Sequence, residues 1–124
     1  MMWRFLFIAF LVAHALVHLA IWLLPKPPDQ KAPFDPNHSW LLGDQRAVAV
    51  LLAVTAAVLL MAGGLGLWAH AGWWRGVAAI GLAASFGLMV VYFNPWYLFI
   101  EGINAALIVG IVWLTWPSET MVGA

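Results

Sequence analysis

Apolar residues fill four long segments of the chain, and most polar and charged residues lie between them. The segments cover residues 3–24, 46–68, 72–93 and 96–116. The length of each segment is close to what a helix needs to cross the hydrocarbon core of a bilayer, about 20 residues. The pattern therefore predicts four transmembrane helices in a single membrane domain, residues 1–124. The first segment contains a small-x-small sequence, Ala13-His14-Ala15, but it is too long for the core of a signal peptide, so we expect a retained helix.

The connections between the segments predict how the helices are arranged. Residues 25–45 form the one long connection, and its prolines at positions 25, 27, 28, 33 and 36 disfavour a helix there. The other connections are short, namely Ala69-His70-Ala71 and a turn at Asn94-Pro95. Short connections make consecutive helices antiparallel. We therefore expect an all-α integral membrane protein, an up-down four-helix bundle with both termini on the same side.

Tryptophans and small residues agree with this arrangement. All nine tryptophans fall near the ends of the predicted helices, as in the aromatic belts of membrane proteins. Small residues recur at every fourth position in three segments, a spacing that lets helices approach closely in lipid. The predicted ridges are Ala49/Ala53/Ala57, Ala79/Ala83/Gly87 and Gly102/Ala106/Gly110. The run Gly63-Gly64-Leu65-Gly66 is expected to ease packing in the same way.

Composition narrows the environment and the partners. The chain is 65% hydrophobic and only 8% charged, which fits a multi-pass membrane protein. Five basic and five acidic residues cancel, so the basic surface that nucleic acid requires is absent. The expected partners are the lipid bilayer and either a second copy of the chain or a membrane complex. Without cysteine, the chain has neither disulfides nor thiolate metal sites. We place the termini in the cytoplasm, because the proline-rich connection has the character of an extracytoplasmic segment.

Ionisable residues inside the apolar segments mark the candidate site, because charge is costly at membrane depth. His14 and His18 are one helical turn apart on one face of the first segment. Glu101 and Asn104 share a face of the last segment, and Tyr97 lies one turn before Glu101. At about 1.5 Å per residue, His18 and Glu101 both lie roughly 7 Å from mid-membrane toward the long connection. His14 and Asn104 both lie within about 3 Å of the centre.

These levels predict two contacts between the first and last helices, His18 with Glu101 and His14 with Asn104. His38, at the entrance to the second helix, is expected to cap the site from the side of the long connection. Thr55 and Ser85 are expected to bond only to carbonyls of their own helices.

The chemistry of this cluster leaves several possibilities open. An imidazole beside a carboxylate suits proton binding. His14, His18 and Glu101 also form a candidate set of ligands for a divalent metal such as zinc. A metalloprotease is excluded, because the residues between the histidines are Ala15-Leu16-Val17 and supply no general base. Haem is disfavoured, because one helix face does not supply both axial ligands.

The first functional hypothesis is a binding protein that holds a proton, a small ligand or a metal at His14, His18, Glu101 and Asn104. It would act as a small transporter or as an accessory subunit. The second is a structural or interaction subunit in which the polar cluster serves packing alone. The third is a membrane enzyme with a His/His/Glu metal centre; no other catalytic signature is present, so we do not expect an enzyme unless that metal is bound.

In size and number of helices the chain resembles small four-helix bacterial membrane proteins, including the DoxX-like group and the small multidrug resistance transporters. The resemblance is one of architecture, and it implies a bacterial inner membrane. The transporters use an essential glutamate in their first span, where this chain has His14 and His18. Their mechanism is therefore not carried over.

Overall fold

The computed structural model describes residues 1–24 and 35–123, and it is built around four long helices. They are α1 (Met2–Leu23), α2 (Arg46–Trp68), α3 (Trp74–Val91) and α4 (Leu98–Val112), the last preceded by the 3-10 helix η1 (Pro95–Tyr97). Counting η1 with α4, all four are long and apolar enough to cross a membrane. The four predicted helices are therefore confirmed, and α2 has the predicted bounds. Residues 25–34 of the proline-rich connection lie outside the described residues.

The turn before α4 forms as the sequence predicts. The side chain of Asn94 accepts a hydrogen bond from the backbone nitrogen of Trp96 at 3.0 Å, and Pro95 occupies the first helical position. Proline suits that position because the first turn of a helix has no use for its missing N–H.

The last helix ends four residues earlier than predicted. After Val112 the chain turns back, and the backbone nitrogen of Trp116 donates to the carbonyl of Gly110 at 2.8 Å. A short helix, α5 (Glu119–Val122), then packs against α1, with Val122 fully buried. The indole of Trp116 packs over Gly110, where a Cβ would lie 3.4 Å from it. Apolar composition alone did not distinguish this folded-back segment from a continuing helix.

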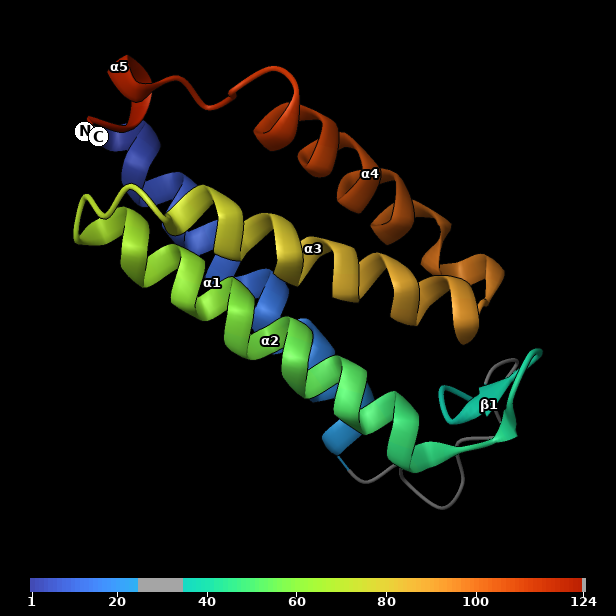
Figure 1. Cartoon of the computed structure of the whole chain (residues 1–124). Coiled ribbons are helices and arrows are strands. Elements are labelled where there is room, and N and C mark those ends of the chain that lie inside the picture. The colour runs from blue at the N-terminus through green and yellow to red at the C-terminus, as the bar shows by residue number, and fades with distance from the viewer. Residues whose placement is uncertain (25–34, 124) are drawn as a thin grey trace.

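The helices pack in chain order, α1 on α2, α2 on α3 and α3 on α4. Figure 1 shows α4 on the side of α3 that faces away from α2, and it shows Met1 and α5 at the same end of the bundle. Two apolar clusters form the core. One is centred on Leu11, Leu60 and Leu82 and the other on Trp22 and Tyr92. Buried polar side chains of α1, α3 and α4 lie between these clusters.

The closest helix contact, between α2 and α3, depends on glycine. A Cβ on Gly63 would lie 2.9 Å from the Cβ of Ala78, and one on Gly81 would lie 3.0 Å from the Cβ of Leu59. These approaches bring the two backbones close together, as small residues do between the helices of membrane proteins. The packing role predicted for the run that begins at Gly63 is therefore confirmed.

The three predicted ridges of small residues differ in whether they are buried. Ala49, Ala53 and Ala57 are buried as predicted. On α3 the buried small residues are instead those at positions 78, 81 and 85, and Ala83 is exposed. On α4 the residues at positions 102 and 106 are exposed, whereas Gly110, the last member of that ridge, is buried against Trp116. The spacing was correctly recognised, but spacing alone does not say which way a ridge points.

Replacing Gly63 with alanine is expected to lower the free energy of unfolding by about 1–3 kcal/mol, because the new methyl group meets the Cβ and backbone of Ala78. The measurement is reversible unfolding of the purified protein in mixed detergent micelles. The matched control is Gly102→Ala, where a Cβ would meet nothing within 4 Å. Equal stability of the two variants would contradict the glycine-dependent contact.

Candidate functional site

Four buried polar side chains meet between the two apolar clusters. His14 and His18 come from one face of α1, Ser85 from the buried face of α3, and Asn104 from the inward face of α4. The Ser85 hydroxyl, His18 and Asn104 are fully buried, and His14 is nearly so. We call these four residues the polar ring.

The polar ring is connected by four short hydrogen bonds. Nε2 of His14 lies 2.9 Å from Oδ1 of Asn104, and Nδ2 of Asn104 lies 2.7 Å from the hydroxyl oxygen of Ser85. That oxygen lies 2.7 Å from Nε2 of His18, and Nδ1 of His18 lies 2.8 Å from the backbone carbonyl of His14. The contacts join three helices that are distant in sequence.

The backbone carbonyl of His14 fixes the direction of every bond in the polar ring. A carbonyl only accepts, so Nδ1 of His18 carries a hydrogen, and the neutral imidazole then accepts at Nε2. Ser85 must give its only hydrogen to that nitrogen, so its oxygen accepts from the amide of Asn104. The amide oxygen of Asn104 consequently accepts from Nε2–H of His14. In a neutral His14, Nδ1 is left as an acceptor, and it has no hydrogen-bond partner among the described residues.

Aromatic rings extend the polar ring along α1. His14 stacks on Phe10, 5.7 Å between ring centroids, and meets the ring of His18 edge to face at 5.1 Å, while His18 stacks on Trp22 at 6.0 Å. Trp22 in turn contacts Tyr97, 5.8 Å between centroids. Tyr97 is thus buried against α1 one level beyond His18, on the side of the long connection.

The predicted contact between His14 and Asn104 is confirmed, and the predicted pairing of His18 with Glu101 is wrong. His18 turns toward α3 and bonds to Ser85, which we had expected to bond only to its own helix. Thr55 does bond to its own helix, at the carbonyl of Leu51. Matching depth placed His18 and Glu101 at one level, but it carried no information about which neighbouring helix each side chain faces.

Among the described residues, Glu101 is the predicted site residue whose side chain is left without a hydrogen-bond partner. It lies on the inward face of α4 between Tyr97 and Asn104, and its side chain is only 9% exposed. Neither carboxyl oxygen has a hydrogen-bond partner in the described part of the chain. An ionised carboxylate without a donor is costly in such a place. The group therefore needs a proton or a hydrogen-bond-donating ligand.

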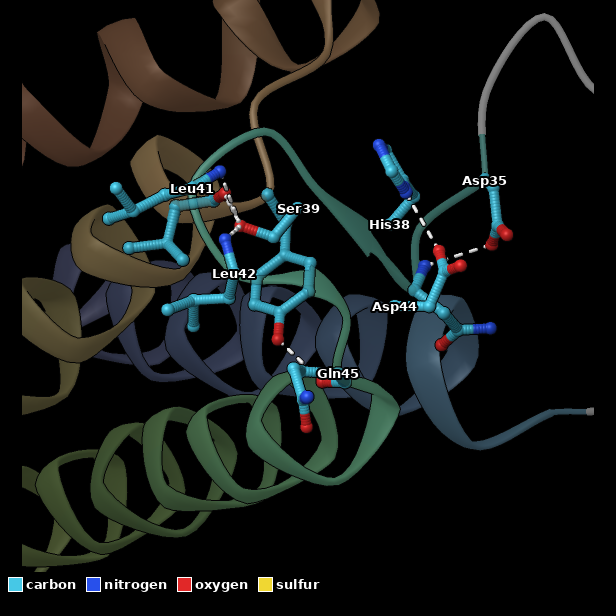
Figure 2. Close-up of polar contacts among 10 residues, drawn as sticks. Asp35, His38, Ser39, Leu41, Leu42, Asp44 and Gln45 are labelled. Carbon is cyan, nitrogen blue, oxygen red and sulfur yellow. Dashed lines mark hydrogen bonds and ion pairs between the residues drawn. The ribbon is translucent and has the colours of Figure 1, made fainter.

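His38 does not cap this cluster. It begins β1 (His38–Ser39), which pairs antiparallel with β2 (Gly43–Asp44) in a short hairpin, and its Nδ1 lies 2.7 Å from Oδ1 of Asp44. The two side chains are 60% and 85% exposed, so this pair points away from the core. Figure 2 shows the pair beside Asp35, on the opposite side of the hairpin from Leu41 and Leu42.

The structure does not gather the predicted metal ligands. Within residues 1–24 and 35–123, no group of three histidine, aspartate or glutamate side chains is arranged to hold a metal ion. His14 is hydrogen-bonded to Asn104 and His18 to Ser85. Glu101 has no hydrogen bond to either histidine.

Comparison of the chain with protein-family models, curated proteins and solved structures finds no match.

Replacing Ser85 with alanine is expected to cost about 1–3 kcal/mol of unfolding free energy, because His18 and Asn104 both lose a buried partner. Thr55→Ala is the matched control, since it removes a hydroxyl that bonds only to its own helix and lies on the exposed surface. That control is expected to change stability by less than about 0.5 kcal/mol. Unfolding curves in which the two variants coincide would argue against the polar ring.

Proposed function

We propose that the chain is a multi-pass protein of a bacterial inner membrane that binds a proton at Glu101, inside the bilayer. The membrane setting is supported by the outward faces of the helices, which expose large apolar side chains such as Leu51, Leu65 and Ile80. It is also supported by the tryptophans, which lie at or beyond helix ends, as interfacial tryptophans do.

The observation that carries the proposal is the isolation of Glu101. Beside it, the polar ring of His14, His18, Ser85 and Asn104 is joined by mutual hydrogen bonds, whereas both oxygens of Glu101 are buried without a hydrogen-bond partner among the described residues. An ionisable side chain at membrane depth is costly and usually marks a pathway or a binding site. A proton is the smallest species that removes the charge without needing room.

A reversible proton site of this kind suits a small transporter, or an accessory subunit of a membrane complex. In either role a change of charge at Glu101 would alter how α4 packs, because Glu101 lies on its inward face. We place the end that carries Met1 and α5 in the cytoplasm, since the long connection has extracytoplasmic character.

The polar ring itself favours a second, structural role. Its hydrogen bonds join α1 to α3, α1 to α4 and α3 to α4, and such contacts contribute about 0.6 kcal/mol each on average in membrane bundles. We therefore assign two roles within the predicted cluster: the polar ring fixes the register of the helices, and Glu101 binds the proton.

Glu101→Gln is expected to remove one titrating carboxylic acid from the protein in lipid vesicles. Infrared difference spectra across a pH titration would show the carbonyl band of the neutral acid in the native chain, and its loss in the variant. Glu119→Gln is the control, because Glu119 is exposed at the start of α5. A titrating band that persists unchanged in Glu101→Gln would refute proton binding at this residue.

The membrane arrangement is testable because the chain has no cysteine. Gln45→Cys and Thr120→Cys introduce single thiols at exposed positions near opposite ends of the bundle. In sealed vesicles of one orientation, a membrane-impermeant maleimide is expected to label one variant and not the other. Labelling of both from the same side would contradict the proposed spanning arrangement.

A further inference from the structure

A groove separates α1 from α4 at the level of His14. It encloses about 230 Å³ and is lined, among others, by Phe10, Ala13, His14 and Val17 of α1 and by Phe99 and Ile103 of α4. Phe99 is 79% exposed, so the groove opens to the outside of the bundle. A second apolar hollow shares Phe10 and continues the groove toward the end that carries Met1.

His14 supplies the one polar wall of this groove. Its Nε2–H is already committed to Asn104, so the nitrogen that remains, Nδ1, is a hydrogen-bond acceptor. A lone pair facing apolar surroundings lacks the donor that water would provide, which is a loss of free energy that a suitable ligand would recover. The vacant acceptor therefore selects for molecules that carry an O–H or N–H group.

The walls and the volume define the rest of the ligand. Phe10 is stacked on His14, 5.7 Å between ring centroids, so a flat ring entering beside them meets aromatic faces. A volume of about 230 Å³ is below the 300–1,000 Å³ of ordinary ligand pockets, which limits the buried part to about one ring. Ketones and ethers offer only lone pairs, so they would face the acceptor nitrogen unfavourably.

We propose that the groove between α1 and α4 binds a lipid-soluble phenol, whose hydroxyl donates to Nδ1 of His14 and whose ring lies against Phe10. The phenol enters sideways from the lipid, across Val17 and Phe99, both of which are exposed. Any alkyl tail extends along the second hollow, past Phe7 and Leu107.

This site does not depend on proton binding by Glu101. Glu101 lies on the inward face of α4 and does not line the groove, whereas Phe99 and Ile103 of the same helix do. The phenol site rests on the proposed membrane setting, but phenol binding and proton binding by Glu101 stand or fall separately.

The test uses two probes that differ by one hydrogen-bond donor, para-hexylphenol and its methyl ether, para-hexylanisole. Each is titrated into the full chain in lipid nanodiscs, and the Nδ1 resonance of His14 is followed by nitrogen NMR. The phenol is expected to shift this resonance saturably and to bind about 2–10-fold more tightly than the ether, the range of one hydrogen bond. Equal affinity of phenol and ether, or no saturable shift with the phenol, overturns the proposal.

A pair of variants separates groove binding from general partition into lipid. Ala13→Phe fills the groove and is expected to weaken phenol binding at least tenfold, while Ala20→Phe adds the same ring at another exposed position of α1. Glu101→Gln is expected to bind the phenol like the native chain, so loss of phenol binding leaves the infrared result on Glu101 unaffected. Equal weakening by Ala13→Phe and Ala20→Phe also overturns the proposal.

Discussion

A polar side chain enclosed among apolar helices must find its hydrogen-bond partner inside the protein, because neither lipid nor a packed core supplies one. In this bundle His14 and His18 of α1 meet the requirement by reaching Ser85 of α3 and Asn104 of α4. A shift of one residue would rotate a helix by about 100° and move it by about 1.5 Å. Such a shift would break these contacts, so the polar ring sets both the rotation and the height of three helices. The apolar clusters on either side are free to vary more, since dispersion contacts have no direction.

The same requirement separates what the sequence could predict from what it could not. The long apolar segments located all four helices, and α2 (Arg46–Trp68) was placed to the residue. Depth along the helices brought His14 to the level of Asn104, and that contact exists. The depth of a residue does not say toward which neighbouring helix its side chain points. His18 was therefore paired with Glu101 rather than with Ser85. A ridge of alanine and glycine on α3 was displaced from the true one by the same lack of information.

Other parts of the structure depend on long-range contacts that no local sequence pattern predicts. The reversal after Val112 requires the indole of Trp116 to settle on Gly110, and α5 requires the surface of α1. The position of His38 follows from the register of a two-residue hairpin, in which it stands opposite Asp44. The separation of Glu101 from the ring was likewise unpredicted, and it matters most for function, because a cluster with every group satisfied would indicate structure alone.

The hairpin has a consequence for the thickness of membrane that α3 can occupy. The side chains of Ser39 and Trp40 donate to the carbonyls of Val91 and Val90, in the last turn of α3, at 2.5 Å and 2.7 Å. With 18 residues, α3 is about 27 Å long, slightly less than the about 30 Å of a typical hydrocarbon core. A helix that ends short would leave its last carbonyls in lipid, with a penalty for each. In the proposed membrane arrangement the hydroxyl and indole donors of the hairpin would meet these carbonyls, so the bilayer would not need to thin to reach this end of α3.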